Sequence, residues 1–185
     1  FITAGDTPAE LLEHYTAAVG RAPHLPDFAA GFWQSRLRYG SQQEVLDIAR
    51  EYRRRGLPMD ILVIDAGYWQ EMGSYAFDPA AWPDPRGMVA ELQDLGIHVM
   101  VSVWPTINKL SPTYAEMEEQ GLLTRSDRGN PAHIAHLMDT RPQGGWPILT
   151  HYDPTHPAAR ELFWKKIRET LYSQGIRLFW LDADE

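Results

Sequence analysis

"YRRRGLPMDILVID" at residues 52–65 holds the pattern that decides the fold: a helix end, then Gly with an apolar residue, then an apolar strand. The same pattern recurs in "LQDLGIHVMVSVWP" (92–105) and "LYSQGIRLFWLDAD" (171–184). In each copy the glycine suits the residue just after a helix, where a left-handed conformation costs little only for Gly. The pattern therefore predicts successive helix–strand units, whose helices end at Gly56, Gly96 and Gly175.

The strands of these units are nearly continuously apolar, without alternation of apolar and polar residues. Such strands are typical of a parallel sheet that is buried on both faces. We expect four strands, at residues 28–35, 60–65, 97–104 and 176–182. Their alternation with helices predicts an α/β fold with right-handed crossovers, either a doubly wound sheet or a (β/α)8 barrel. No GxGxxG or P-loop motif follows a strand, which weighs against a nucleotide-binding sheet. Four units make half a barrel, since a full one takes about 250 residues.

Capping signals predict where the helices begin. "TPAE" (7–10) combines a Thr cap, a Pro at the first helical position and a Glu three residues after the cap, and "SQQE" (41–44) is a capping-box pattern. Pro also follows Asp84, Ser111 and His156, a position typical of the first turn of a helix. We therefore expect helices at 8–19, 41–55 and 157–174, with further helix starts at Pro85 and Pro112.

Two stretches fall outside the repeated units. Residues 1–22 contain one helix and a Pro-rich lead-in, and we expect them to be separate from residues 23–185. The chain opens with "FITAGDTP" and no Met, so we expect it to be an excerpt of a longer protein. Residues 121–152 are polar and rich in Gly and Pro, and connections of that length are usually functional or mobile.

Composition excludes several classes of function. The formal net charge of −8 weighs against a nucleic-acid partner. The chain has no Cys, which excludes disulfides, a thiol nucleophile and Cys-ligated zinc. No apolar run reaches the ~18 residues of a membrane-spanning helix, so we expect a soluble protein without a membrane partner. The compartment, whether cytoplasm, periplasm or outside the cell, and the oligomeric state stay open.

The predicted carboxyl ends of the four strands carry the chemistry, because parallel α/β folds place their sites there. These ends have the sequences "FWQSR" (32–36), "IDAGYW" (64–69), "VWPTI" (103–107) and "WLDADE" (180–185). All four contain an aromatic residue and two contain acids. Aromatic faces suit sugar rings, and carboxylates suit sugar hydroxyls or an oxocarbenium-like transition state. The pattern therefore favours a carbohydrate site.

Each of these residues has a structural alternative. Asp182 is either an ionised group facing a pocket or the cap of a strand or helix end. Asp65 either binds sugar hydroxyls or belongs to a turn before Gly67. The tryptophans at the strand ends either stack on a sugar or fill the core; they are Trp33, Trp69, Trp104 and Trp180.

Two histidine-containing stretches raise the question of a metal. They are "HIAH" (133–136) and "HYDPTH" (151–156), whose spacings suit zinc only loosely. No third carboxylate follows at a fixed offset. We therefore expect neither a metal nor another cofactor.

The chain resembles glycoside hydrolase family 31, the retaining α-glycosidases that include α-xylosidases and α-glucosidases. The resemblance is carried by "GFWQSRLRYGSQQEVLDIAREYRRRGLPMDILVID", "HVMVSVWP", "YDPTHPAARELFW" and "FWLDADE". The family's nucleophile motif is W-x-D-x-x-E, which matches Trp180 to Glu185 and makes Asp182 the nucleophile. The family's fold is a (β/α)8 barrel behind a β-sandwich. The resemblance thus implies that residues 23–185 form the first half of the catalytic barrel and that residues 1–22 are the exit from an upstream domain with a lead-in helix.

The resemblance also implies a mechanism and a substrate class. In double displacement Asp182 attacks the anomeric carbon of an oligosaccharide, and a second carboxylic acid protonates the leaving oxygen. In the family this acid comes later in the barrel, beyond residue 185. Many α-glucosidases of the family have D-x-D-Y and D-P where this chain has "DAGY" (65–68) and "WP" (104–105), which favours α-xylosidase specificity over α-glucosidase or α-transglucosylase. The expected substrate-binding residues are Asp65, Trp104, Trp146, Trp180, Trp33 and Glu185. A sugar-binding barrel without catalysis is the alternative from another class.

Overall fold

The computed structural model describes residues 4–130, 132–135 and 148–183. Internal packing divides the chain into two units, residues 1–30 and residues 31–185. The first unit contains helix α1 (Pro8–Val19) and a 3-10 helix, η1 (Asp27–Ala30). The predicted capping box of α1 is confirmed: Thr7 Oγ1 accepts the N–H of Glu10, whose carboxylate accepts the N–H of Thr7.

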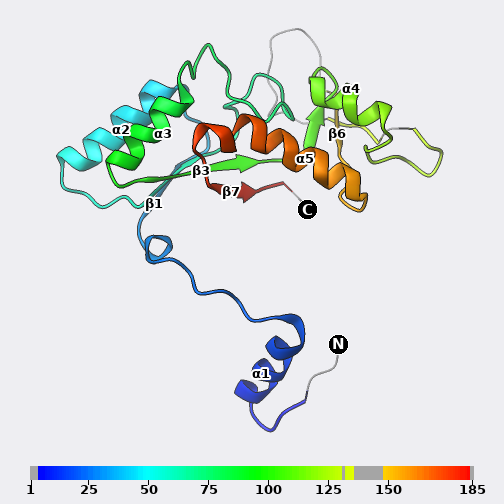
Figure 1. The fold of residues 1–185 in the computed structure, drawn as a ribbon, viewed down its shortest axis with the longest axis horizontal. Helices are drawn as coiled ribbons and strands as arrows, with labels where there is room; N and C mark the ends of the chain where they lie inside the picture. Colours follow the sequence, from blue (N-terminus) through cyan, green and yellow to red (C-terminus); the bar gives the residue numbers. More distant parts are fainter. Residues whose placement is uncertain (1–3, 131, 136–147, 184–185) are drawn as a thin grey trace. The chain divides into compact units, whose positions relative to one another are not determined.

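A parallel sheet of four strands organises the second unit (Figure 1). Its order is β1 (Trp33–Arg36), β2 (Ile61–Ile64), β3 (His98–Val103) and β7 (Leu178–Leu181). Each strand pairs in parallel with the next, which confirms the parallel α/β prediction. Within the described ranges β1 and β7 each have one neighbour, so both are edge strands.

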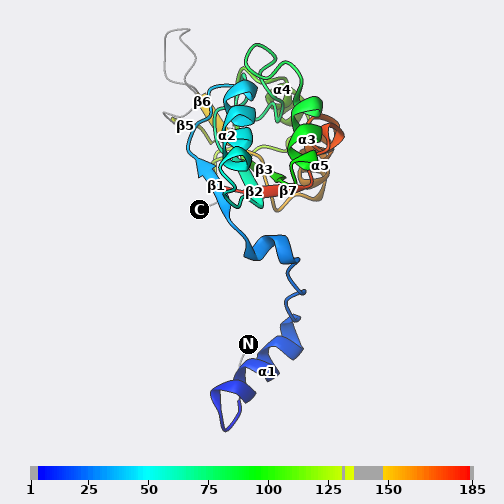
Figure 2. The ribbon, with the colours of Figure 1, turned by 90° about the vertical axis from the view of Figure 1, so that its left-hand side faces the viewer.

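Three helices cover one side of this sheet, as Figure 2 shows. They are α2 (Gln42–Arg54), α3 (Pro85–Asp94) and α5 (Pro157–Thr170), the last followed by the 3-10 helix η2 (Tyr172–Gln174). The glycines predicted to end the repeated helices have φ values of 66°, 70° and 102° at Gly56, Gly96 and Gly175, which confirms their left-handed conformation.

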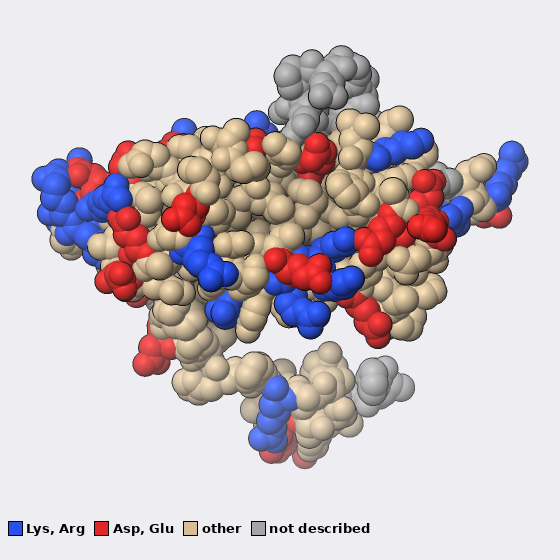
Figure 3. Space-filling model, turned by 45° about the horizontal axis from the view of Figure 1, so that its top comes forward, with Lys and Arg blue, Asp and Glu red and all other residues tan. Residues whose placement is uncertain are grey.

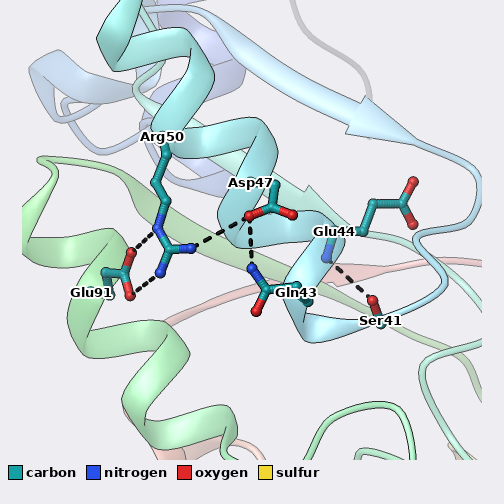
Figure 4. Close-up of polar contacts among 6 residues, drawn as sticks. All are labelled: Ser41, Gln43, Glu44, Asp47, Arg50 and Glu91. Atoms are coloured by element: carbon teal, nitrogen blue, oxygen red, sulfur yellow. Dashed lines mark hydrogen bonds and ion pairs between the residues drawn. The ribbon is translucent and has the colours of Figure 1, made fainter.

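On β2 and β3, the side chains that face the helices are aliphatic and buried. They are Leu62, Ile64, Val99, Val101 and Val103. Helices α2 and α3 are joined above them by a two-pronged ion pair (Figure 4). Arg50 Nε lies 2.6 Å from Glu91 Oε1, and Arg50 Nη2 lies 2.9 Å from Glu91 Oε2. The hydrogen bond from Arg50 to Glu91 raises the arginine pKa above its usual value.

The first strand begins later than predicted. We expected a strand over 28–35, but residues 27–30 form η1, and β1 begins at Trp33. The N–H of Ala29 donates to the Pro26 carbonyl at 2.9 Å, which closes a turn instead of extending the chain. The ladder with β2 starts at the pair Trp33–Ile61. One residue earlier in each segment, the Asp60 carboxylate accepts the N–H of Phe32.

Residues 121–152 are not solely a loop, which corrects the interpretation of this stretch as one long connection. They contain β5 (Ile134–Ala135) and β6 (Ile148–His151). These strands join β4 (Thr106–Asn108) in an antiparallel sheet of order β4-β6-β5, and helix α4 (Pro112–Glu119) follows β4. Among the described residues, no helix is long and apolar enough to cross a membrane.

Candidate active site

The carboxyl ends of β2, β3 and β7 bring polar side chains to one face of the parallel sheet. Val101 of β3 pairs with Ile64 on one side and with Phe179 on the other. Successive side chains of a strand point to opposite faces. Because Ile64 and Val101 face the helices, the residues that follow them, Asp65 and Ser102, face the opposite side. Asp182, one residue after β7, joins them there, and its N–H donates to the Val103 carbonyl at 3.1 Å.

Both oxygens of the Asp182 carboxylate accept hydrogen bonds. Oδ1 accepts the N–H of Ala183 at 2.9 Å, and Oδ2 accepts the hydroxyl of Ser102 at 3.2 Å. Ala183 has φ of 56°, the left-handed region that a residue with a Cβ seldom adopts. The N–H of Ala183 meets the carboxylate of the residue before it. Asp182 is therefore held at two points and is still partly exposed.

Behind Asp182 lies a buried set of polar contacts. The indole Nε1 of Trp104 donates to Ser102 Oγ at 3.0 Å, and Ser102 is fully buried. The hydroxyl of Tyr68 donates to the Ser102 carbonyl, and that of Tyr75 donates to the Trp104 carbonyl, each at 3.1 Å. Burial raises the pKa of both tyrosines, so both hydroxyls stay protonated donors. The end of β3 is thus fixed by neutral donors.

Asp65 ends β2 on the same face and is half-buried. Burial raises the pKa of its carboxyl group above the usual value; the hydrogen bond from the Ala66 N–H opposes this, and the charge of Asp182 raises the pKa further. The Ala66 N–H lies 2.6 Å from Asp65 Oδ1. The influence of Asp182 on Asp65 places the two carboxylates within electrostatic reach of each other.

The tryptophans fall into two groups. Trp69 and Trp104 are buried and contact each other edge to face, with ring centroids 6.1 Å apart. Trp33 and Trp180 are 42% and 40% exposed and line a hollow of about 450 Å³. Neither carboxylate lines this hollow. Trp33 also lies at the amino end of β1, which corrects its placement at a carboxyl end; the late start of the strand is the reason.

Some predicted site residues lie outside the described residues. These are Trp146 and Glu185, together with His136 of the "HIAH" stretch. Among the residues that are described, no three His, Asp or Glu side chains gather in a way that could hold a metal ion.

Sequence reasoning did not single out Ser102. The available signal was a single Ser between Val101 and Val103, in a strand that is otherwise apolar. A hydroxyl at a position facing away from the helices needs a partner when it is buried. Here the partners are Trp104 and Asp182, which are two and 80 residues away.

Surface charge is mixed. On the face that Figure 3 shows, Lys and Arg alternate with Asp and Glu over the helices and do not gather into one basic patch. A nucleic-acid backbone needs a concentrated basic surface. This face therefore offers no such surface.

Comparison with known proteins identifies the family. Residues 22–185 match the family model "Glycosyl hydrolases family 31 TIM-barrel domain". The whole chain is 45% identical to a family 31 glucosidase of Pseudescherichia vulneris, of which it covers 33%, and 32% identical to an α-xylosidase of Saccharolobus solfataricus, of which it covers 22%. A crystal structure of an α-xylosidase from a soil metagenome, solved with xylose, shares 44% identity at a TM-score of 0.89, with 97% of this chain and 25% of that one covered.

The match confirms the barrel that the family resemblance implied, where the repeated units alone had left a doubly wound sheet or a barrel open. The chain spans a third or less of these relatives. It belongs to glycosyl hydrolase family 31 and forms part of the family's TIM-barrel domain.

Proposed function

We propose that this chain is part of a retaining exo-α-glycosidase that removes terminal α-linked sugars from oligosaccharides by double displacement. Asp182 is the nucleophile. Its general acid/base partner lies in a later part of the barrel, and retaining enzymes hold these two carboxyls about 5–5.5 Å apart. Asp65, Trp180 and Trp104 form the sugar-binding surroundings.

One observation carries this proposal: Asp182 is held by two donors at a strand end and faces away from the helix-covered core. A nucleophile has to be ionised, oriented and reachable by substrate. Among the described residues, the donors to Asp182 are the N–H of Ala183 and the hydroxyl of Ser102 on the neighbouring strand β3.

We propose α-xylosidase specificity within the family. A second acid after Asp65, as in D-x-D-Y, would occupy position 67. Gly67 has φ of 86°, and a Cβ there would lie 3.1 Å from Nε of Arg38. The positive φ strains any residue with a Cβ at this position, and with glycine there the site has one carboxylate fewer for a glucose hydroxymethyl group. The α-xylosidase with xylose and the α-xylosidase of S. solfataricus support the same choice.

Two other functions remain as outcomes of the test. An α-glucosidase is the first alternative, supported by the 45% identity to an uncharacterized family 31 glucosidase, and an α-transglucosylase would share its substrate. A sugar-binding barrel without catalysis would retain the pocket and lack turnover.

Covalent labelling of the full-length protein tests the nucleophile. A 5-fluoro-α-xylosyl fluoride should inactivate the enzyme and add one sugar to Asp182, detected by peptide mass mapping. Attachment at another carboxylate would overturn the assignment. Binding of xylose without labelling or turnover would indicate the sugar-binding barrel.

Competing aryl glycosides test the specificity. We expect kcat/KM for the aryl α-xyloside to exceed that for the α-glucoside by about tenfold or more, the effect of one extra group in a closed pocket. The opposite order would favour the α-glucosidase alternative. Transfer of the sugar to an added alcohol or sugar, measured in the same assay, would indicate a transglycosylase.

A further inference from the structure

Three side chains form a hydrogen-bonded chain that ends on Asp182. Trp104 Nε1 donates to Ser102 Oγ at 3.0 Å, and Ser102 Oγ donates to Asp182 Oδ2 at 3.2 Å. An indole N–H can only donate, and an ionised carboxylate can only accept. Ser102 must therefore accept from Trp104 and give its one proton to Asp182. The direction of the chain is determined by the chemistry of its two ends.

Ser102 itself is rigidly placed. It lies on the central strand β3, pairs with Trp180 of β7, and is 0% exposed. Its carbonyl accepts the buried hydroxyl of Tyr68. A small side chain in such a strand could be Ala if packing alone mattered. A buried hydroxyl is tolerated here because both of its hydrogen bonds are satisfied.

We propose that Ser102 is a positioning residue that holds the Asp182 carboxylate in the orientation for attack on the anomeric carbon, with Trp104 setting the direction of the Ser102 hydroxyl. This inference rests on the proposed role of Asp182 as nucleophile. The Ala183 N–H holds Oδ1 and Ser102 holds Oδ2, so the two donors together determine how the carboxylate is rotated. Without Ser102 only one of its oxygens is held by the described residues.

A neutral donor suits this place because a nucleophilic carboxylate has to keep its charge available for attack. A Lys or Arg in place of Ser102 would stabilise Asp182 but would also bind it as an ion pair and weaken it as a nucleophile. The serine hydroxyl orients the carboxylate without neutralising it.

Substitution of Ser102 in the full-length enzyme tests the proposal. Ser102→Ala should lower kcat and the rate of covalent labelling by about ten- to hundredfold, the size of one hydrogen bond to a charged group, with little change in KM. Ser102→Thr keeps the hydroxyl and should restore most of the rate. Should the Ala variant fold poorly, Ser102→Cys fills a similar volume with a weak donor and should lose rate to an intermediate degree.

Ser111 provides a matched control. It is also a buried serine, and its Oγ caps α4 by accepting the N–H of Thr113 at 3.3 Å. Ser111→Ala should lower the thermal unfolding midpoint and leave kcat unchanged. A loss of rate in Ser102→Ala that merely follows lost stability would appear in this control as well, and that result would overturn the proposal.

A double-mutant cycle tests the role of Trp104. Trp104→Phe removes the donor and keeps an aromatic ring, so it should lower the labelling rate less than Ser102→Ala does. In the Ser102→Ala background the same change should lower the labelling rate much less, because the hydrogen-bonded series from Trp104 to Asp182 is already interrupted. Full additivity would overturn the assigned role of Trp104.

The labelling assay separates this inference from the proposed function. Absence of label on Asp182 in the wild-type enzyme would mean that the proposed function fails. Normal labelling of Asp182 in both wild type and Ser102→Ala would leave the nucleophile assignment intact and overturn the positioning role of Ser102.

Discussion

The two faces of the parallel sheet differ in the kinds of side chain that they carry. On the two inner strands, β2 and β3, the face toward α2, α3 and α5 consists of buried aliphatic side chains. The opposite face carries Ser102, Trp180 and, at the strand ends, Asp65 and Asp182. On the first face, stability depends on filled volume, which several side chains can provide. On the second face, the arrangement depends on particular donors and acceptors, which few residues can replace.

The largest expected effect lies on the second face. Asp182→Asn keeps the shape of the side chain and removes the charge, so activity should fall by roughly 10³-fold or more, as for loss of a nucleophile. The free energy of unfolding should change little. Aryl α-xyloside turnover and chemical denaturation of the full-length protein measure the two quantities.

Asp94→Asn is the control for this prediction. It makes the same chemical change at an exposed residue of α3. Its activity and stability should match the wild type. Near-normal turnover in Asp182→Asn would contradict the view that the second face is specialised for chemistry while the first face serves packing.

The next effect concerns the first face. Ile64 is 1% exposed on the helix side of β2, so Ile64→Ala should lower the free energy of unfolding by about 2–5 kcal/mol through lost burial and a cavity. Denaturant titration measures this loss. Ser35→Ala, an exposed position of the neighbouring strand, should change stability by less than about 0.5 kcal/mol. Equal losses would contradict the difference between the faces.

The smallest effect is a pH dependence at Asp65. Its raised pKa means that the folded protein binds this proton more tightly than the unfolded chain. Ionised Asp65 therefore destabilises the fold, and this cost appears as the pH rises through the raised pKa. Asp65→Asn should be slightly more stable than the wild type at pH 7 and equal to it in acid, as unfolding midpoints across pH would show. A variant that is less stable at pH 7 would contradict this sign.

Much of the architecture was predictable from local signals. The glycines at 56, 96 and 175 and the capping residues of the helices determine where units begin and end, and all of these act within a few residues. The antiparallel sheet was missed because its strands are short and pair residues 106–108 with 149–151. The start of β1 was missed because the apolar residues before it resemble a strand, while a local turn at Pro26 and Ala29 takes precedence.

Those residues of the candidate site that directly follow a strand were predictable from the sequence. Asp65 and Asp182 stand directly after apolar strands, and the structure brings both to one face. Their catalytic and binding roles stay predictions. Ser102 could not be found by position along the chain, because its importance depends on a partner 80 residues away.

That separation has a consequence for folding. The helix–strand units form from contacts close in sequence, whereas the surroundings of Asp182 require β7 to pair with β3 and the Ser102 hydroxyl to meet a carboxylate 80 residues later. Contacts of long sequence separation carry a larger loop-closure cost and form later. A chain emerging from the ribosome can therefore complete its first three strands before Asp182 is ordered, and the Ser102 hydroxyl meets the Asp182 carboxylate at the last step of assembly of this sheet.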